Sequence, residues 1–353
     1  YKAQAYEQQW QVINLEAKRG DIYTSDGYPI SSTTNSYIVS VKSDVFISSH
    51  DEMDTLSKKE LLEILPKEEI EIIRNQKNIW QEFKNEITWD QRQSLEELDI
   101  SGLSYKEVFK RNYNEPMLFS HILGFVGKGK EGEQVGYYGL EQYYNGDLKG
   151  QSGWLFQEQS ATGKPIIWGG KRLVEPINGS NLHLTLVRYL QFLTMRKLEE
   201  GVKKHAAKSG TIIIVNPASG GIVAMANYPT YDPAAYKEVS NENNIVFRNN
   251  AISTTYEPGS VIKALTMAAA LDSSSVSLND QYNDTGPRYF SGHEVDNWDG
   301  KHHGQETLTE ILQHSNNMGA AWLGLKTGGE TLIKYLEKFS FGNKLNIDLE
   351  GEE

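Results

Sequence analysis

The chain has 353 residues, enough for two domains with a core in each, and its hydrophobic (38%) and charged (23%) fractions are ordinary for a globular protein. Its net charge of −12 argues against a nucleic-acid partner, which requires a basic surface. Because the chain contains no cysteine, it cannot hold a disulfide framework, a redox-active thiol or a cysteine-ligated zinc site.

The N-terminal part of the sequence combines a strand-like segment with a long helical one. Residues 37–41 have the pattern of a strand, whereas the leucines and isoleucines of residues 57–98 recur at helical spacing. We expect two or three helices in that segment, with apolar stripes that include Trp80 and Phe83 and a break at Pro66. No apolar run in the sequence is long enough to span a bilayer.

Strand patterns dominate the middle of the chain. Residues 152–179 alternate apolar and polar side chains, as antiparallel strands do, and residues 182–207 read as a strand end followed by a helix. Residues 211–215 and 222–226 are separated by turn-forming Asn, Pro and Gly residues, which predicts a β-hairpin. From Pro258 onward the pattern is mainly helical, over residues 261–271, 307–325 and 332–339.

These patterns predict an α+β fold in two domains. The first, residues 1–180, is expected to be a mixed-β domain with a helical insertion at about 55–115, and the second, residues 181–353, a domain of helices and antiparallel strands. The chain starts at Tyr1 without an initiator Met, and we expect that a segment upstream has been removed.

The segment 257–263, Glu-Pro-Gly-Ser-Val-Ile-Lys, carries the strongest chemical signal. Its Pro-Gly pair breaks the chain before an apolar helix, so Ser260 falls in the first turn and Lys263 one turn later on the same face. A lysine amine beside a serine hydroxyl activates a nucleophile when burial keeps the amine neutral. The alternative is a solvated serine and a surface lysine, because on the order of one Ser-x-x-Lys match is expected by chance.

A second polar cluster, residues 314–319, interrupts the apolar helical run of residues 308–325. It is either a short turn between two helices or a group of side chains that faces a cleft beside Ser260. In the second interpretation Ser315 relays a proton, and Asn317 holds a substrate amide or the lysine. A rival Ser-x-Asn at residues 277–279 lies in a polar loop and is less suited to this role.

Two further clusters are not expected to carry chemistry. Lys326-Thr327-Gly328 follows a helix directly and is read as a helix C-cap, because serine-acyl enzymes need such a triplet on an edge strand. A segment rich in His and Asp is interpreted as a polar loop near the active-site mouth, since its spacing matches no firm metal pattern. Its members are His293, Asp296, Asp299, His302 and His303. No metal and no cofactor is predicted.

Taken together, the motifs resemble those of class B penicillin-binding proteins, which are peptidoglycan DD-transpeptidases, and the matching segments cover nearly the whole chain. In the first domain they are Arg19-Gly20-Asp21-Ile22 with Gly27, Arg111-x-Tyr113, residues 121–127, and Gly139-Leu140-Glu141. In the second they are Leu190-Gln191, residues 222–233, Ser260-x-x-Lys263, Ser315-x-Asn317, residues 339–342 and Glu350-Gly351-Glu352. Thr24-Ser25 stands where the family usually has Asp-Arg.

The resemblance implies an elongated pedestal domain followed by a penicillin-binding transpeptidase domain of the serine β-lactamase type. In the family the Lys-Thr-Gly strand follows the segment that corresponds to residues 350–352, so the domain is expected to be incomplete here and this fragment inactive alone. The catalytic residues implied are Ser260, Lys263, Ser315 and Asn317.

The same resemblance implies peptidoglycan stem peptides as substrates, and penicillin and other β-lactams as inhibitors that acylate the serine. It implies an N-terminal membrane helix, absent from this chain, that anchors the protein at the extracytoplasmic face of the bacterial cell membrane, with a SEDS-type glycosyltransferase as membrane partner. The alternatives are a β-lactam-sensing receptor, a non-catalytic cell-wall scaffold and, less favoured, a serine β-lactamase.

Overall fold

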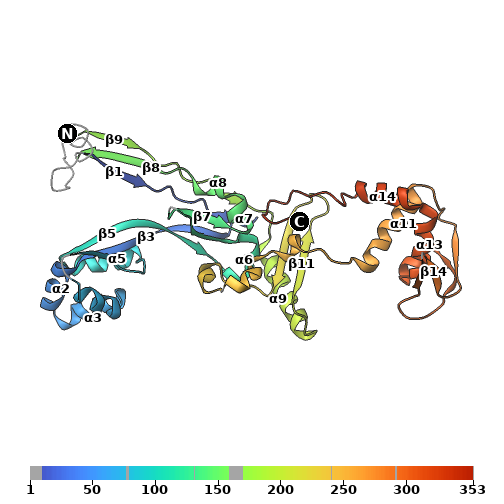
Figure 1. The fold of residues 1–353 in the computed structure, drawn as a ribbon, viewed down its shortest axis with the longest axis horizontal. Coiled ribbons are helices and arrows are strands. Elements are labelled where there is room, and N and C mark those ends of the chain that lie inside the picture. The colour runs from blue at the N-terminus through green and yellow to red at the C-terminus, as the bar shows by residue number, and fades with distance from the viewer. Residues whose placement is uncertain are drawn as a thin grey trace. The chain divides into compact units, whose positions relative to one another are not determined.

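The computed structural model describes residues 10–76, 79–130, 132–158, 170–239, 241–290 and 292–352. The chain divides into two compact units, residues 1–252 with 348–351 and residues 253–347 with 352–353, and each combines helices with mainly antiparallel strands (Figure 1). The α+β prediction is therefore confirmed. The domain boundary expected at residues 180–181 stays a prediction.

The first unit is built on a long antiparallel strand pair, β3 (Pro29–Lys42) with β5 (Leu103–Tyr113). Successive side chains of β3 point to opposite faces, and its apolar residues Tyr37, Val39 and Val41 are buried. Three short strands complete this sheet: β2 (Ile22–Tyr23), β4 (Trp80–Glu82) and β10 (Leu182–His183). The strand predicted at residues 37–41 is thus confirmed, as part of β3.

Four helices supply the apolar residues that pack against β3. They are α2 (Ser43–Glu52), α3 (Thr55–Ile64), α4 (Lys67–Arg74) and α5 (Trp89–Glu97). Pro66 is the N-cap of α4, which confirms the predicted break. Phe46, Leu61 and Leu95 are fully buried in the shared core.

The expected helical insertion, residues 55–115, is only partly helical. Trp80 lies in β4, and Phe83 follows it with its backbone N–H bonded to the carbonyl of Val39 at 2.8 Å, so no helix contains the two aromatic residues. The end of the segment is β5. Both the segment with Trp80 and Phe83 and the end of the insertion pair with β3 as strands. Two apolar residues three apart indicate a helix only weakly, so this long-range pairing determines the structure.

A buried ion cluster joins segments that are far apart in the sequence. The carboxylate of Glu141 accepts from Arg19 Nε at 2.6 Å and from Arg111 Nε at 2.7 Å, and all three side chains are nearly inaccessible. These are residues of three separate motifs in the sequence. An unpaired buried charge is strongly destabilising, so each of these three side chains needs its partners from the other two motifs in the folded state.

The remaining strands and helices of this part are short. A separate three-stranded sheet contains β1 (Trp10–Leu15), β8 (Gly153–Glu158) and β9 (Lys171–Val174). Its last two strands confirm the antiparallel pattern predicted for residues 152–179, of which residues 159–169 lie outside the described residues. The other elements are α6 (Pro116–Leu123), β6 (Phe125–Lys128), β7 (Gln134–Tyr137), α7 (Gly139–Tyr143) and α8 (Asn145–Lys149).

The first unit also contains the predicted hairpin, β11 (Gly210–Val215) with β12 (Ile222–Tyr228), and the predicted helix, α9 (Arg188–Lys204). Gln191 of α9 is fully buried and bonds the backbone N–H and carbonyl of Met225 at 2.8 Å each, which fixes the helix on the hairpin. Short helices follow: η1 (Pro233–Glu238), η2 (Asn241–Phe247) and α10 (Asn250–Ser253).

The second unit is mainly helical, with two small hairpins. Its helices are η3 (Gly259–Val261), α11 (Ile262–Asp272), α12 (Leu308–Gln313), α13 (Asn317–Thr327) and α14 (Gly329–Lys338). Its strands are β13 (Gln281–Asp284) paired with β16 (Gly304–Thr307), and β14 (Arg288–Phe290) paired with β15 (His293–Val295). Met267, Ile311 and Met318 from three helices meet in its core. None of the helices in the described ranges has both the length and the apolar character needed to cross a bilayer.

Candidate functional site

Ser260 and Lys263 lie where the sequence predicts, at the start of a helix. Gly259 has a φ of +60°, a conformation that favours glycine, and it opens the 3₁₀ turn η3 that leads directly into α11. Ser260 is exposed to solvent, whereas Lys263 is half-buried one turn further along. The hydroxyl is therefore open to a substrate, and the amine is partly shielded from water.

Ser315 and Asn317 come from the turn between α12 and α13. Ser315 takes a left-handed conformation with a φ of +53°, and this residue reverses the chain between the two helices. Asn316 is the N-cap of α13, since its side-chain oxygen accepts from the N–H of Gly319 at 2.7 Å. The cluster is thus a turn between two helices, and it also places Ser315 beside Ser260; the roles expected for Ser315 and Asn317 in a reaction stay predictions.

All four predicted residues meet in one hydrogen-bonded group. The Lys263 amine donates to Asn317 Oδ1 at 2.5 Å, to the Ser315 carbonyl at 2.6 Å and to Ser315 Oγ at 3.1 Å. Ser315 Oγ in turn donates to Ser260 Oγ at 3.0 Å. The connection between the serine and the lysine therefore runs through Ser315.

Burial lowers the pKa of the Lys263 amine from its ordinary value, because desolvation disfavours the ammonium form. Oxygen acceptors surround the nitrogen, and no full negative charge is among its three hydrogen-bond partners. An amine with a lowered pKa is neutral in a larger fraction of molecules and can accept a proton. The arrangement suits general-base activation of a hydroxyl.

A second set of polar residues is hydrogen-bonded to the turn between α12 and α13. The sequence gives little sign of these residues. Asn297 Oδ1 accepts from the N–H of Asn317 at 2.9 Å, and Asn297 Nδ2 donates to Asp284 at 2.7 Å. Asn316 Nδ2 donates to the same Asp284 oxygen at 2.9 Å and also to Glu306. All four supporting side chains are buried.

Asp284 is the charged centre of this support. Burial by itself would raise the pKa of its carboxyl, but bonds from the N–H groups of Gly286 and His303 and from Asn297 and Asn316 outweigh it and lower the pKa. The carboxylate is therefore ionised at neutral pH. Because its side-chain partners lie 13 and 32 residues away in the sequence, no local motif marks Asp284.

The triplet Lys326-Thr327-Gly328 is a helix C-cap, as predicted. Lys326 and Thr327 end α13, and Gly328, with a φ of +79°, donates its N–H to the carbonyl of Gly324 at 3.0 Å. The left-handed glycine closes one helix and opens the next.

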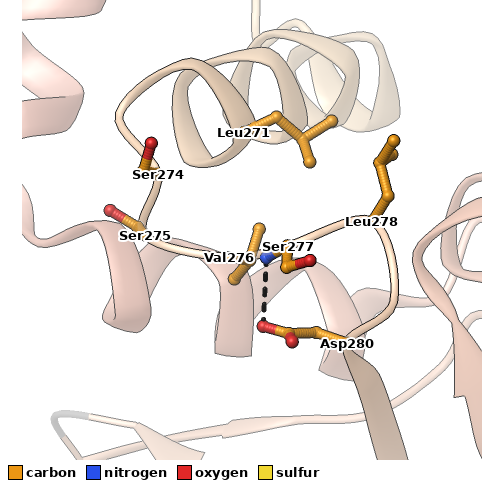
Figure 2. A pocket seen from close by; sticks show the side chains of 7 residues that line it. All are labelled: Leu271, Ser274, Ser275, Val276, Ser277, Leu278 and Asp280. Carbon is orange, nitrogen blue, oxygen red and sulfur yellow. Dashed lines mark hydrogen bonds between the residues drawn. The ribbon is translucent and has the colours of Figure 1, made fainter.

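The rival Ser-x-Asn lies in a loop at the other end of α11. A hollow of about 640 Å³ is present there, lined by Leu271, Leu278 and polar residues of the loop (Figure 2). Its Ser277 N–H is bonded to Asp280 at 3.2 Å. The helix rises about 1.5 Å per residue, so some 12 Å along its axis separate Lys263 from Leu271. Among the described residues, Ser277 has no link to a lysine like the one that connects Ser260 to Lys263 through Ser315.

Of the His- and Asp-rich segment, two residues support or border the site. The carbonyl of Asp296 accepts from Asn317 Nδ2 at 2.8 Å, and the backbone N–H of His303 donates to Asp284. Asp299 bonds the N–H of Lys301 and is a local turn residue.

Comparison with known proteins gives matches along most of the chain. Residues 14–184 match the family model "Penicillin-binding Protein dimerisation domain", and residues 210–353 match "Penicillin binding protein transpeptidase domain". Stage V sporulation protein D of Bacillus subtilis is 34% identical over 267 residues, which are 75% of this chain and 40% of that protein. Peptidoglycan D,D-transpeptidase FtsI of Buchnera aphidicola is 28% identical over 359 residues, covering 100% of this chain and 61% of FtsI.

Solved structures agree on the fold. Penicillin Binding Protein 2X from Streptococcus thermophilus superposes with a TM-score of 0.78 at 23% identity, over 97% of this chain and 54% of that one. This chain thus spans roughly two fifths to three fifths of the length of its curated relatives. With both domain types matched in their order along the sequence, the chain belongs to the penicillin-binding proteins that combine a dimerisation domain with a transpeptidase domain.

Proposed function

We propose that this chain supplies the pedestal and the nucleophile-bearing part of a peptidoglycan DD-transpeptidase. The observation that carries the proposal is the hydrogen-bonded group of Ser260, Lys263, Ser315 and Asn317. A serine at a helix start, linked through Ser315 to an amine with a lowered pKa, is an arrangement for acyl transfer. The relatives named as D,D-transpeptidases support the substrate class, which is the stem peptide of peptidoglycan.

In the proposed reaction Ser260 attacks the carbonyl of the penultimate D-Ala of a donor stem. With the amine neutral, the hydroxyl protons reorient so that Ser260 donates to Ser315 and Ser315 donates to Lys263. As the new C–O bond forms, the Ser260 proton passes to Ser315, whose own proton moves to Lys263. The C–N bond to the terminal D-Ala then breaks, and the proton returns through Ser315 to the leaving amine.

The second half of the reaction restores the enzyme. An amine of an acceptor stem attacks the acyl-Ser260 ester, its excess proton is taken up by the Lys263–Ser315 pair, and the ester bond breaks to give the crosslink and the free hydroxyl. The backbone N–H of Ser260, at the start of η3 and α11, is positioned to stabilise a developing oxyanion. Asn317, fixed by Lys263 and Asp296, has the role of positioning the substrate amide.

A β-lactam carries an acyl group that Ser260 can accept, so penicillin is expected to trap the enzyme as a stable adduct. The substrate lies outside the cytoplasm, and we therefore place the active protein at the extracytoplasmic face of the membrane. A SEDS-type glycosyltransferase is the proposed partner of the pedestal, because crosslinking requires newly made glycan strands.

The test is covalent labelling with fluorescent penicillin of the natural protein that carries this sequence, followed by mass spectrometry of the labelled peptide. The expected result is one persistent adduct on Ser260 that is lost in Ser260→Ala. Rapid loss of the label would indicate a β-lactamase, and an adduct on another serine or no adduct would reject the assignment. Crosslinking of stem peptides in vitro then separates a transpeptidase from a β-lactam sensor.

A further inference from the structure

The second unit contains a group of three side chains that the proposed reaction does not use. His303, Glu306 and His314 each bring one potential ligand atom to the same place, and these atoms all lie within 4.8 Å of one another. They come from the residue before β16, from β16 itself and from the residue after α12. The sequence does not reveal the group, because Glu306 and His314 fall outside the His- and Asp-rich segment.

The group is gathered around one oxygen atom of the Glu306 carboxylate. Glu306 Oε1 lies 2.5 Å from Nδ1 of His314 and 3.9 Å from Nδ1 of His303. The two imidazole rings are stacked, with centroids 4.7 Å apart and planes inclined by 15°, so one ring has to turn for both Nδ1 atoms to bind one ion in the planes of their rings.

The Glu306 carboxylate is shielded from solvent and held in one orientation, as a metal ligand would be. Its side chain is 2% exposed, and its other oxygen, Oε2, is bonded to Asn316. A carboxylate that is oriented by an outer hydrogen bond is a recurrent feature of metal sites, since it fixes the direction of the ligating oxygen. His314 is 45% exposed, which leaves an entry path for an ion and room for a water ligand.

We propose that His303, Glu306 and His314 form a binding site for a divalent transition-metal ion of the zinc class. Two imidazoles and one carboxylate are a ligand set that zinc uses when a fourth position stays open to water. Bound at about 2.0–2.1 Å from each ligand, the ion would separate His314 Nδ1 from Glu306 Oε1 to about 3.3 Å. Because metal ligands must be deprotonated, binding of the ion competes with protonation of these side chains.

Such an ion would stabilise the turn that contains Ser315. His314 immediately precedes Ser315, and Asn316, which holds Glu306, immediately follows it. A metal at this point would therefore tie both neighbours of Ser315 to β16. The proposal does not rest on the transpeptidase function, because the ligands and the ion can be measured without any substrate.

The experiment is titration of the untagged chain with Zn²⁺ by isothermal titration calorimetry, with Co²⁺ absorption spectroscopy to report the coordination. We expect one ion per chain, a tetrahedral Co²⁺ spectrum and at least tenfold weaker Zn²⁺ binding in His314→Asn and in Glu306→Gln. His302→Asn is the matched control, since this exposed neighbour lies outside the group and its loss is expected to leave binding unchanged.

The outcomes are distinct. The absence of saturable binding, or binding that is equal in His314→Asn and in the wild type, overturns the proposal and leaves an adventitious ion only. A rise of the melting temperature with Zn²⁺ in the wild type but not in His314→Asn supports it and shows that the exposed substitution has not prevented folding. If this chain binds Zn²⁺ but the natural protein that carries it is not labelled by penicillin, the proposed function is rejected and the metal site is kept.

Discussion

At the scale of residues, the sequence predicts the parts of the site whose residues are close together along the chain. Ser260 and Lys263 are three residues apart, so helix geometry alone predicts that they share a face. Ser315 and Asn317 are predicted as a pair, but their contact with Lys263 spans 52 and 54 residues and requires the tertiary fold. Asp284 and Asn297 were not predicted, because buried polar support has no sequence period.

Removing the Lys263 amine is expected to abolish most acylation in the natural protein. Lys263→Ala and Lys263→Arg are both predicted to lower the penicillin acylation rate by about 10²–10⁴-fold, since neither has an amine that can become neutral. The Lys263 pKa is lowered, so the wild-type rate should rise with pH and level off below the ordinary lysine value of 10.5. Stopped-flow labelling across pH checks this, and a near-normal rate in either variant would reject the role of the base.

Two substitutions of Ser315 separate its chemistry from its backbone conformation. Ser315→Ala and Ser315→Gly both remove the relay hydroxyl, so we expect similar losses of acylation. Glycine relieves the left-handed strain at φ +53°, about 1 kcal/mol, and the glycine variant should therefore melt about 2–4 °C above the alanine variant. Differential scanning calorimetry measures the difference, and equal melting temperatures would show that the turn is not strained.

At the scale of elements, sequence patterns predict the helices and hairpins that carry strong local signals. The hairpin of β11 and β12 has β-branched strands on both sides of a Pro- and Gly-containing turn, and α11 has a Pro-Gly start and an apolar body. The structure confirms both. The Trp80–Phe83 segment was assigned incorrectly, because pairing with β3 lies outside any local window. Lys326-Thr327-Gly328 was identified correctly as a helix C-cap from its place directly after a helix.

Gln191 is the element-scale test. Replacing it with leucine keeps the volume but leaves the Met225 N–H, the Met225 carbonyl and the Leu118 carbonyl without their bonds to α9. Each buried unsatisfied group costs about 1–3 kcal/mol, and we expect a total loss of about 3 kcal/mol in the free energy of unfolding. Urea titration measures it. Tyr189→Ala, at a 67% exposed position of the same helix, is the control and should stay within about 0.5 kcal/mol of the wild type.

At the scale of the whole molecule, one buried histidine couples stability to pH. His121 bonds the Val246 carbonyl through Nε2 at 3.0 Å, so this nitrogen carries the proton, and burial lowers the pKa of the ring to about 4. The unfolded chain takes up a proton near the ordinary value of 6.5, while the folded chain resists it down to about 4. This contribution to stability is complete above pH 6.5 and is lost as the pH falls.

Urea unfolding between pH 7 and pH 4 should therefore show a slope from His121 of up to about 1.4 kcal/mol per pH unit. His121→Gln can still donate to the Val246 carbonyl but does not titrate, and the slope should become shallower in this variant. An unchanged slope would assign the acid sensitivity to other groups.

The architecture of the whole molecule was predictable from the sequence only because many short motifs, taken together, resemble those of one family. Arg19, Arg111 and Glu141 look unrelated along the chain, yet they form one buried ion cluster. Chain length and the hydrophobic patterns predicted two domains and an α+β class, but they could not predict which strands pair. Strand register depends on contacts between segments that are far apart in the sequence, such as Ser31 with Tyr113.

The β11–β12 hairpin has a consequence for handling the chain. In the described residues this sheet has two strands, and Ile213, Ile214 and Val215 of β11 are 41%, 37% and 48% exposed. A β-branched strand with a free backbone edge is a template for cross-chain pairing, which is the route to aggregation. The aggregation of this chain should consequently increase with its concentration. Ile213→Lys should reduce aggregation, because a charge on this strand disfavours pairing between two copies.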